Sequence, residues 1–191
     1  MTTVPFSTFT MPSGLRVVTV PQPQLHRAHI ALYARVGSRF ETAEENGISH
    51  FLEHMMYRGT SRLGSAHEVN SAFERLGGYL YAATHTDFGV FPLGFTITGT
   101  QEHVDSFTVE QLRAHHQRHY TAGSCVLAIA GALSDTDARR IAEEGFGAVP
   151  PGPAVTTRAP VHTQKKARLK VVENVSSQTE LRVCVRAIAE S

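Results

Sequence analysis

Two histidines and a glutamate in one short stretch have the types and spacing needed for metal-assisted chemistry. The stretch His50-Phe51-Leu52-Glu53-His54 reads H-x-x-E-H. An α-helix has about 3.6 residues per turn, so His50 and His54 would project from one face and could bind one metal ion. Glu53 lies on the same rim, where its carboxylate could take a proton from a metal-bound water. The pattern predicts His50 and His54 as metal ligands and Glu53 as the catalytic base.

The flanks of this motif argue against a chance match. The order is the inverse of H-E-x-x-H and is called the inverzincin motif. Gly37-Ser38-Arg39-Phe40-Glu41 and Asn46-Gly47-Ile48-Ser49 precede it, and Met55-Met56-Tyr57-Arg58-Gly59-Thr60 follows it. These stretches resemble the M16 family of pitrilysin, insulinase and mitochondrial processing peptidase. The resemblance implies a zinc-dependent metalloendopeptidase, with Zn2+ as cofactor, a peptide or polypeptide as substrate, and a metal-activated water as nucleophile.

The order of the predicted elements indicates an α+β fold. Strand patterns cover 6–10, 15–20, 29–36, 79–84, 88–91 and 124–131, and Pro12-Ser13-Gly14 marks a hairpin between the first two. Helical patterns cover 47–57, 65–77, 109–120 and 135–141, with capping boxes at Ser65/Glu68 and Thr108/Gln111. Strands and helices do not alternate strictly, so we expect a two-layer α/β sandwich with helices on one face of a mostly antiparallel sheet. The M16 resemblance implies the same architecture, the LuxS/MPP-like metallohydrolase half-domain.

The length and the proline distribution suggest one domain followed by a short remnant. The chain has 191 residues, which suits one domain or slightly more. Pro150-Pro151-Gly152-Pro153 marks a linker. We therefore expect an M16-like N-terminal α/β domain over 1–150, a linker over 151–166, and the opening strands of a second, incomplete M16-like half over 167–191. Within the first domain, Phe91 is followed at once by Pro92. The helical insert that the resemblance implies at this point is therefore missing.

The missing insert has a chemical consequence, because a catalytic zinc needs three protein ligands and one open position. In the M16 family the third ligand is a glutamate on that insert. The possible substitutes are Glu68, Glu74, Glu102, His103, His115 and His119. His115 and His119 have i, i+4 spacing of their own, but a solvated or partly packed helix face is the simpler interpretation. The family's substrate-contacting Asn-Ala-x-Thr strand corresponds to Tyr81-Ala82-Ala83-Thr84, which lacks the asparagine.

Charge, apolar runs and cysteines bear on the partners, the location and the disulfides of the protein. The formal net charge of +1 gives no support for a nucleic-acid partner. The chain shows no signal peptide and no apolar run long enough to span a membrane, so we expect a cytoplasmic protein without a membrane partner. Cys125 and Cys184 both lie in apolar, strand-like runs. Two buried free thiols are the expectation, with a disulfide as the alternative.

Three functions fit these observations. The first is a zinc metalloendopeptidase, which we expect to bind zinc weakly and hydrolyse peptides poorly because the third ligand and most of the second half are missing. The second is a non-catalytic M16-like binding subunit, which would work with a second M16-like chain or as a homo-oligomer. The third is an incomplete gene product. The sequence alone does not decide among them.

Overall fold

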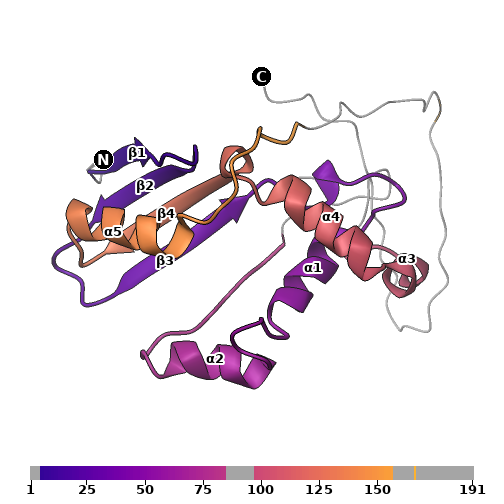
Figure 1. Ribbon diagram of the computed structural model, residues 1–191, viewed down its shortest axis with the longest axis horizontal. Coiled ribbons are helices and arrows are strands. Elements are labelled where there is room, and N and C mark those ends of the chain that lie inside the picture. The colour runs from indigo at the N-terminus through magenta and orange to yellow at the C-terminus, as the bar shows by residue number, and fades with distance from the viewer. Residues whose placement is uncertain (1–4, 85–96, 157–165, 167–191) are drawn as a thin grey trace. The chain divides into compact units, whose positions relative to one another are not determined.

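The computed structural model describes residues 5–84, 97–156 and 166. The chain divides into two compact units, 1–157 and 158–191. All elements named below belong to the first unit (Figure 1). They are β1 (Ser7–Thr10), β2 (Arg16–Pro21), β3 (Ala28–Ala34), α1 (Ile48–Met56), α2 (Ala66–Glu74), α3 (Gln101–Ser106), α4 (Val109–His119), β4 (Cys125–Gly131) and α5 (Asp135–Phe146), with short 3-10 helices at Ser38–Phe40 and Ala122–Ser124. Within the described ranges no helix has the length and apolar content to cross a membrane.

The strands form one sheet in the order β1-β2-β4-β3 (Figure 1). β1 and β2 make the expected antiparallel hairpin, with Phe9 opposite Val17. β4 runs parallel to β2 and antiparallel to β3, with Leu127 paired to both Val17 and Leu32. Two of the three pairings are therefore antiparallel. The prediction of an α+β fold with a mostly antiparallel sheet is confirmed.

The main core lies between one face of this sheet and α5. Alternate residues of β4 point to opposite faces, which buries Cys125, Leu127 and Ile129 completely on the α5 side. Ala138 and Ala142 of α5 pack against them and are also fully buried. Small alanines let the helix backbone approach the sheet closely. Cys125 is a free, buried thiol, whereas Cys184 lies outside the described residues.

A second, smaller core joins α1 to α4. Ile48 and Leu52 of α1 pack against Leu112 of α4, and Phe51, Phe107 and Tyr120 border this cluster. The rings of Phe51 and Phe107 lie 5.8 Å apart. The apolar stripe predicted for the motif helix is therefore its packing face. Residues on the other side of α1 are left available for chemistry.

Three sequence expectations differ from the structure. The predicted strand 79–84 is wrong, because the segment has no regular structure and leaves Tyr79 and Tyr81 exposed. α3 was not expected; Thr100 caps it by accepting a hydrogen bond from the His103 amide at 3.2 Å. α5 starts where predicted but runs beyond Ile141 to Phe146. The predicted strand 88–91 lies outside the described residues.

The start of the predicted linker is bound to the first unit. The Ala122 amide donates to the Pro150 carbonyl at 2.9 Å, and the Gly123 amide donates to the Gly152 carbonyl at 3.1 Å. The Ser124 hydroxyl accepts from the Val155 amide at 3.0 Å. Residues 157–165 and 167–191 lie outside the described part, so the boundaries of the linker and of the second half stay predictions.

Candidate metal centre

The motif helix α1 begins at a position that only glycine can occupy. Gly47, the residue before the helix, has φ 94° in the left-handed region. A Cβ there would lie 2.6 Å from the Thr98 carbonyl oxygen and 2.7 Å from the Gly99 backbone. The chain around Gly99 thus packs directly on the start of α1. This contact fixes the point from which the motif residues project.

The N-terminal end of α1 is capped by a carboxylate from earlier in the chain. Glu41 is 7% exposed, and its Oε2 accepts from the Gly47 amide at 2.8 Å while its Oε1 accepts from the Ser49 amide at 3.0 Å. Asn46 Nδ2 donates to the same Oε2 at 3.2 Å. A negative charge here satisfies amides that the helix cannot pair and complements its dipole. In the sequence, Glu41 is noticeable only as part of the flank that resembles the M16 family. Its capping role has no local sequence signature, because Glu41 lies six and eight residues before the amides that it binds.

His50 and His54, called the motif pair below, lie on one face of α1 with their ring nitrogens converging. Their Nε2 atoms are 3.1 Å apart, and the rings are nearly perpendicular at 84°. Two nitrogens bound to one tetrahedral zinc at 2.0–2.1 Å would stand about 3.3 Å apart. The pair therefore fits two positions of a zinc ion. Its role as a ligand pair stays a prediction.

A third ligand is not found in the part of the chain that the structure describes. No group of three or more His, Cys, Asp or Glu side chains there could hold a metal ion. The six candidates from the sequence all lie in described segments, so none of them completes a site with the motif pair. They are Glu68, Glu74, Glu102, His103, His115 and His119.

Glu53, the predicted base, is held by a threonine from the irregular segment before residue 85. Thr84 Oγ1 donates to Glu53 Oε2 at 2.6 Å. Burial, followed by the charge of Glu53, raises the pKa of Tyr57. Burial also raises the pKa of Tyr120 to about 12, with smaller contributions from Cys125 and Glu53. The carboxylate therefore lies near two phenols that stay protonated at neutral pH, and one of its oxygens is fixed by Thr84.

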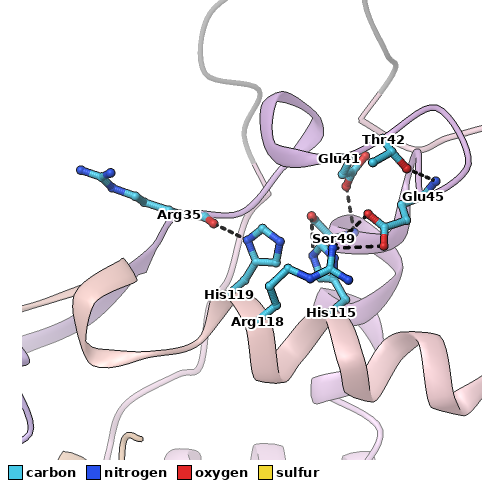
Figure 2. Close-up of polar contacts among 8 residues, drawn as sticks. All are labelled: Arg35, Glu41, Thr42, Glu45, Ser49, His115, Arg118 and His119. Atoms are coloured by element: carbon cyan, nitrogen blue, oxygen red, sulfur yellow. Dashed lines mark hydrogen bonds and ion pairs between the residues drawn. The ribbon is translucent and has the colours of Figure 1, made fainter. Parts of the chain in front are cut away.

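His115 and His119 of α4, called the buried pair below, are not in the solvated or partly packed position expected for them. Both are 0% exposed, and their rings stack at 4.2 Å with an angle of 25°. His115 Nε2 lies 3.1 Å from Ser49 Oγ, and His119 Nδ1 lies 2.8 Å from the Arg35 carbonyl oxygen (Figure 2). Ser49 Oγ also accepts from the Gly37 amide at 3.0 Å. The buried pair thus connects α4 to the start of α1 and to the end of β3.

The environment keeps the buried pair uncharged. Burial, together with the smaller effects of the neighbouring His119, Arg118 and His116, lowers the pKa of His115 to about 3. Burial also lowers the pKa of His119, against the opposing effect of its hydrogen bond to Arg35. At neutral pH both rings are therefore neutral. Sequence reasoning recognised their spacing but missed this structural role.

Two protein-family models match this chain. The model of the Insulinase family, peptidase family M16, matches residues 16–111. The model of the peptidase M16 inactive domain matches residues 106–187. The chain belongs to peptidase family M16. The matches include the motif pair and Glu53, and together they reach from β2 to near the C-terminus.

Relatives of this M16 chain include proteins named as proteases. It is 29% identical to Uncharacterized zinc protease YmxG of Bacillus subtilis, over 86% of this chain and 56% of that protein. It is 26% identical to the Probable mitochondrial-processing peptidase subunit beta of Arabidopsis thaliana, over 78% of this chain and 40% of that protein. The M16 chain thus spans about half the length of these curated relatives or less.

The alignments also show residues that this M16 chain lacks. The alignment with the Bacillus subtilis relative covers 231 positions, 40 more than the 191 residues of this chain. That relative therefore has at least 40 internal residues without a counterpart here. The predicted place of the missing stretch, directly after Phe91, stays a prediction.

Solved structures support the M16 fold. A mutant of the ferredoxin protease FusC, in complex with Arabidopsis ferredoxin, matches with a TM-score of 0.67 and 20% identity. The match covers 81% of this chain and 25% of that one. At this identity the likeness establishes the fold alone.

Proposed function

We propose that this chain carries the zinc-binding and proton-transfer residues of an M16 metalloendopeptidase. One observation carries the proposal: the Nε2 atoms of His50 and His54 converge to 3.1 Å beside Glu53, whose carboxylate is held by Thr84. The family and the names of the relatives support zinc as the metal and a peptide as the substrate.

In this proposal each residue has a separate task. His50 and His54 would hold zinc, which when bound lowers the pKa of a water and polarises the substrate carbonyl. Glu53 would accept a proton from that water and later donate it to the leaving amine. Thr84 occupies Oε2 of Glu53, so the proton is expected at Oε1. The Thr84 hydrogen bond would also keep the carboxylate from rotating away from the metal side of α1.

We expect the turnover of this chain to be low. The described residues provide two nitrogen donors and no third ligand, so zinc would be held loosely. A catalytic group or ion displaced by about 1 Å can cost about a hundredfold in rate. The asparagine of the substrate strand is also replaced, and residues 79–84 form no strand to which a peptide could add.

Cleavage of a quenched fluorescent peptide mixture tests the proposal. The wild-type chain and Glu53→Gln would be compared with and without added zinc, after stripping metal with a chelator. The expected result is slow, zinc-dependent cleavage that Glu53→Gln reduces by about a hundredfold or more. Cleavage that persists in Glu53→Gln would contradict the role of Glu53 and indicate a contaminating protease.

A second candidate function is a non-catalytic M16 subunit. It is favoured because the described residues provide only two of the three protein ligands that a catalytic zinc needs. One relative is named as a subunit of a processing peptidase, so a second M16-like chain or a second copy is the proposed partner. Zinc titration by calorimetry separates the candidates: a chain that binds no zinc but forms a defined oligomer in light scattering would fit the subunit role.

A further inference from the structure

The buried pair lies where α1, α4 and the end of β3 meet. His115 is bonded to Ser49 Oγ, and the backbone amide of Ser49 is bonded to the cap Glu41. His119 is bonded to the Arg35 carbonyl oxygen at the end of β3. The ring of Phe40 stands edge-on to His119, with centroids 6.3 Å apart. One stacked pair thus links the start of the motif helix to two other elements (Figure 2).

Each ring of the pair has one nitrogen without a partner among the described residues. These atoms are His115 Nδ1 and His119 Nε2, both buried. A protonated imidazole donates from both nitrogens. A proton on either ring would therefore place an N–H or a charge in a buried position without an acceptor, which is costly. It would also place a positive charge against the other ring of the stack.

The charges around the pair are mixed. On α4 itself, Arg118 and His116 lie close enough to disfavour a proton on His115. From the segment before α1, Glu41 and Glu45 favour a proton on His119, against Arg118 and burial. Arg118 forms an ion pair with Glu45 at 3.3 Å, so part of this negative charge is already compensated. Burial is the largest cause for both rings, and it favours the neutral form.

We propose that the buried pair is an acid-sensitive clamp that holds the N-terminal end of the motif helix α1 against α4 and β3. While both rings are neutral, the stack, the Ser49 contact and the Arg35 contact hold α1 in place. When His115 takes a proton, its buried Nδ1 carries an N–H without an acceptor and its charge lies against His119, so the stack opens and the first turn of α1 separates from α4. The clamp acts on the position of the motif residues without contacting a metal or a substrate. It goes beyond the proposed function, and it would operate equally in a catalytic or a non-catalytic M16 chain.

The pH range of the clamp follows from the direction of the pKa shift. A histidine whose pKa is lower in the folded state than when exposed stabilises the closed form fully above its ordinary pKa of about 6.5. This stabilisation falls as the pH drops from about 6.5 to the folded pKa, which for His115 is about 3. Each pH unit within that range shifts the opening equilibrium by about tenfold. From pH 7.5 to 4.5, His115 alone therefore accounts for an increase of about a hundredfold.

Amide hydrogen exchange on the full, metal-free chain tests the clamp. Protection factors would be measured by NMR between pH 7.5 and 4.5 and corrected for intrinsic exchange rates. Between pH 7.5 and 4.5 we expect the protection factors of the Gly47 and Ser49 amides to fall by at least about a hundredfold. As the pH is lowered, these two amides should lose all protection at a pH where the Ile129 amide of β4 is still protected. Equal protection of α1 and β4 at every pH would show that only global unfolding responds to acid. That result, or a flat profile, would overturn the proposal.

A matched pair of variants assigns the effect. His115→Gln keeps a polar group near Ser49 but cannot take a proton. The fall in the protection factors of Gly47 and Ser49 between pH 7.5 and 4.5 should therefore be about a hundredfold smaller in this variant than in the wild type. His67→Gln removes an exposed histidine of α2 and should leave the profile unchanged. An unchanged profile in a folded His115→Gln would overturn the clamp. Should that variant fail to fold, the ring nitrogen shifts of wild-type His115 decide: a neutral ring at pH 5 supports the clamp, and titration near pH 6.5 contradicts it.

Discussion

The motif pair and the buried pair have the same spacing and opposite environments. Both consist of two histidines four residues apart on an α-helix, one pair on α1 and the other on α4. The rings of the motif pair are nearly perpendicular at 84° and bring two nitrogens to 3.1 Å. The rings of the buried pair lie almost parallel at 25°, and each bonds to a different protein atom.

Packing accounts for this difference. On α1 the apolar residues Ile48 and Leu52 turn toward α4, which leaves the motif pair on another face. On α4 the buried pair itself faces α1 and the end of β3. There His115 Nε2 bonds to Ser49 Oγ, and His119 Nδ1 bonds to the Arg35 carbonyl oxygen. Parallel rings direct their in-plane lone pairs side by side rather than toward one point. In this chain the motif pair therefore remains a metal-site candidate, whereas the nitrogens of the buried pair are directed to Ser49 and Arg35.

The largest expected contrast is in folding stability. In the metal-free chain at pH 7.5, His119→Ala should lower the free energy of unfolding by about 3 kcal/mol, because it leaves a cavity and an unpaired Arg35 carbonyl oxygen. His54→Ala, on the exposed side of α1, should change it by less than about 0.5 kcal/mol. Urea denaturation followed by circular dichroism measures both values. Equal losses for the two variants would break the distinction between the pairs.

Zinc affinity should show the reverse order. His54→Ala should weaken zinc binding by about a hundredfold or more. Removing a residue that only hydrogen-bonds to a metal ligand already costs up to about a hundredfold in affinity, and His54 is itself a proposed ligand. His115→Gln should leave the affinity within about threefold of the wild type. Isothermal titration calorimetry with zinc measures both. Tight binding that survives His54→Ala would point to ligands other than the motif pair.

The cap of α1 offers a smaller effect. Glu41→Gln removes the charge from two backbone hydrogen bonds at the helix start, to Gly47 and Ser49. We expect a loss of about 1–2 kcal/mol in the free energy of unfolding, the range for a lost helix cap. Glu74→Gln, at the exposed C-terminal end of α2, is the control and should have no measurable effect. A thermal melt at neutral pH compares the two, and a Glu41→Gln chain as stable as wild type would show that the cap is dispensable.

The smallest effect is expected at the ion pair that borders the buried pair. Arg118 and Glu45 lie 3.3 Å apart with side chains 51% and 24% exposed. Exposed ion pairs contribute little, so a double-mutant cycle with Arg118→Ala and Glu45→Ala should give a coupling below about 0.5 kcal/mol. Added salt should reduce it further. A coupling several times larger would show that this pair stabilises the fold more than an exposed ion pair does.

Local sequence signals predicted most of the elements around the site. The apolar stripe of the motif helix, the hairpin turn before β2 and the capping box at Thr108 and Gln111 are all present in the structure. The strand predicted at 79–84 is absent, although its aromatic and apolar residues are typical of strands. A strand needs a partner along its edge, and the local sequence does not specify that partner. The short helix α3 was missed for the complementary reason, because six residues show too little periodicity.

The sequence by itself determined that His50, Glu53 and His54 share one rim of a helix, and that the chain resembles the M16 family, because helical geometry and a motif with its flanks are local properties. Only the tertiary structure decided that Glu41 caps this helix, that Thr84 holds Glu53, and that His115 and His119 are buried and neutral. Each of these depends on segments distant in sequence packing together: Ser49 and His115 are 66 residues apart, and Arg35 and His119 are 84 apart. Spacing places two imidazoles on one side of a helix, and in this chain the tertiary contacts leave the motif pair facing away from the α1–α4 core while they bond the buried pair to Ser49 and Arg35.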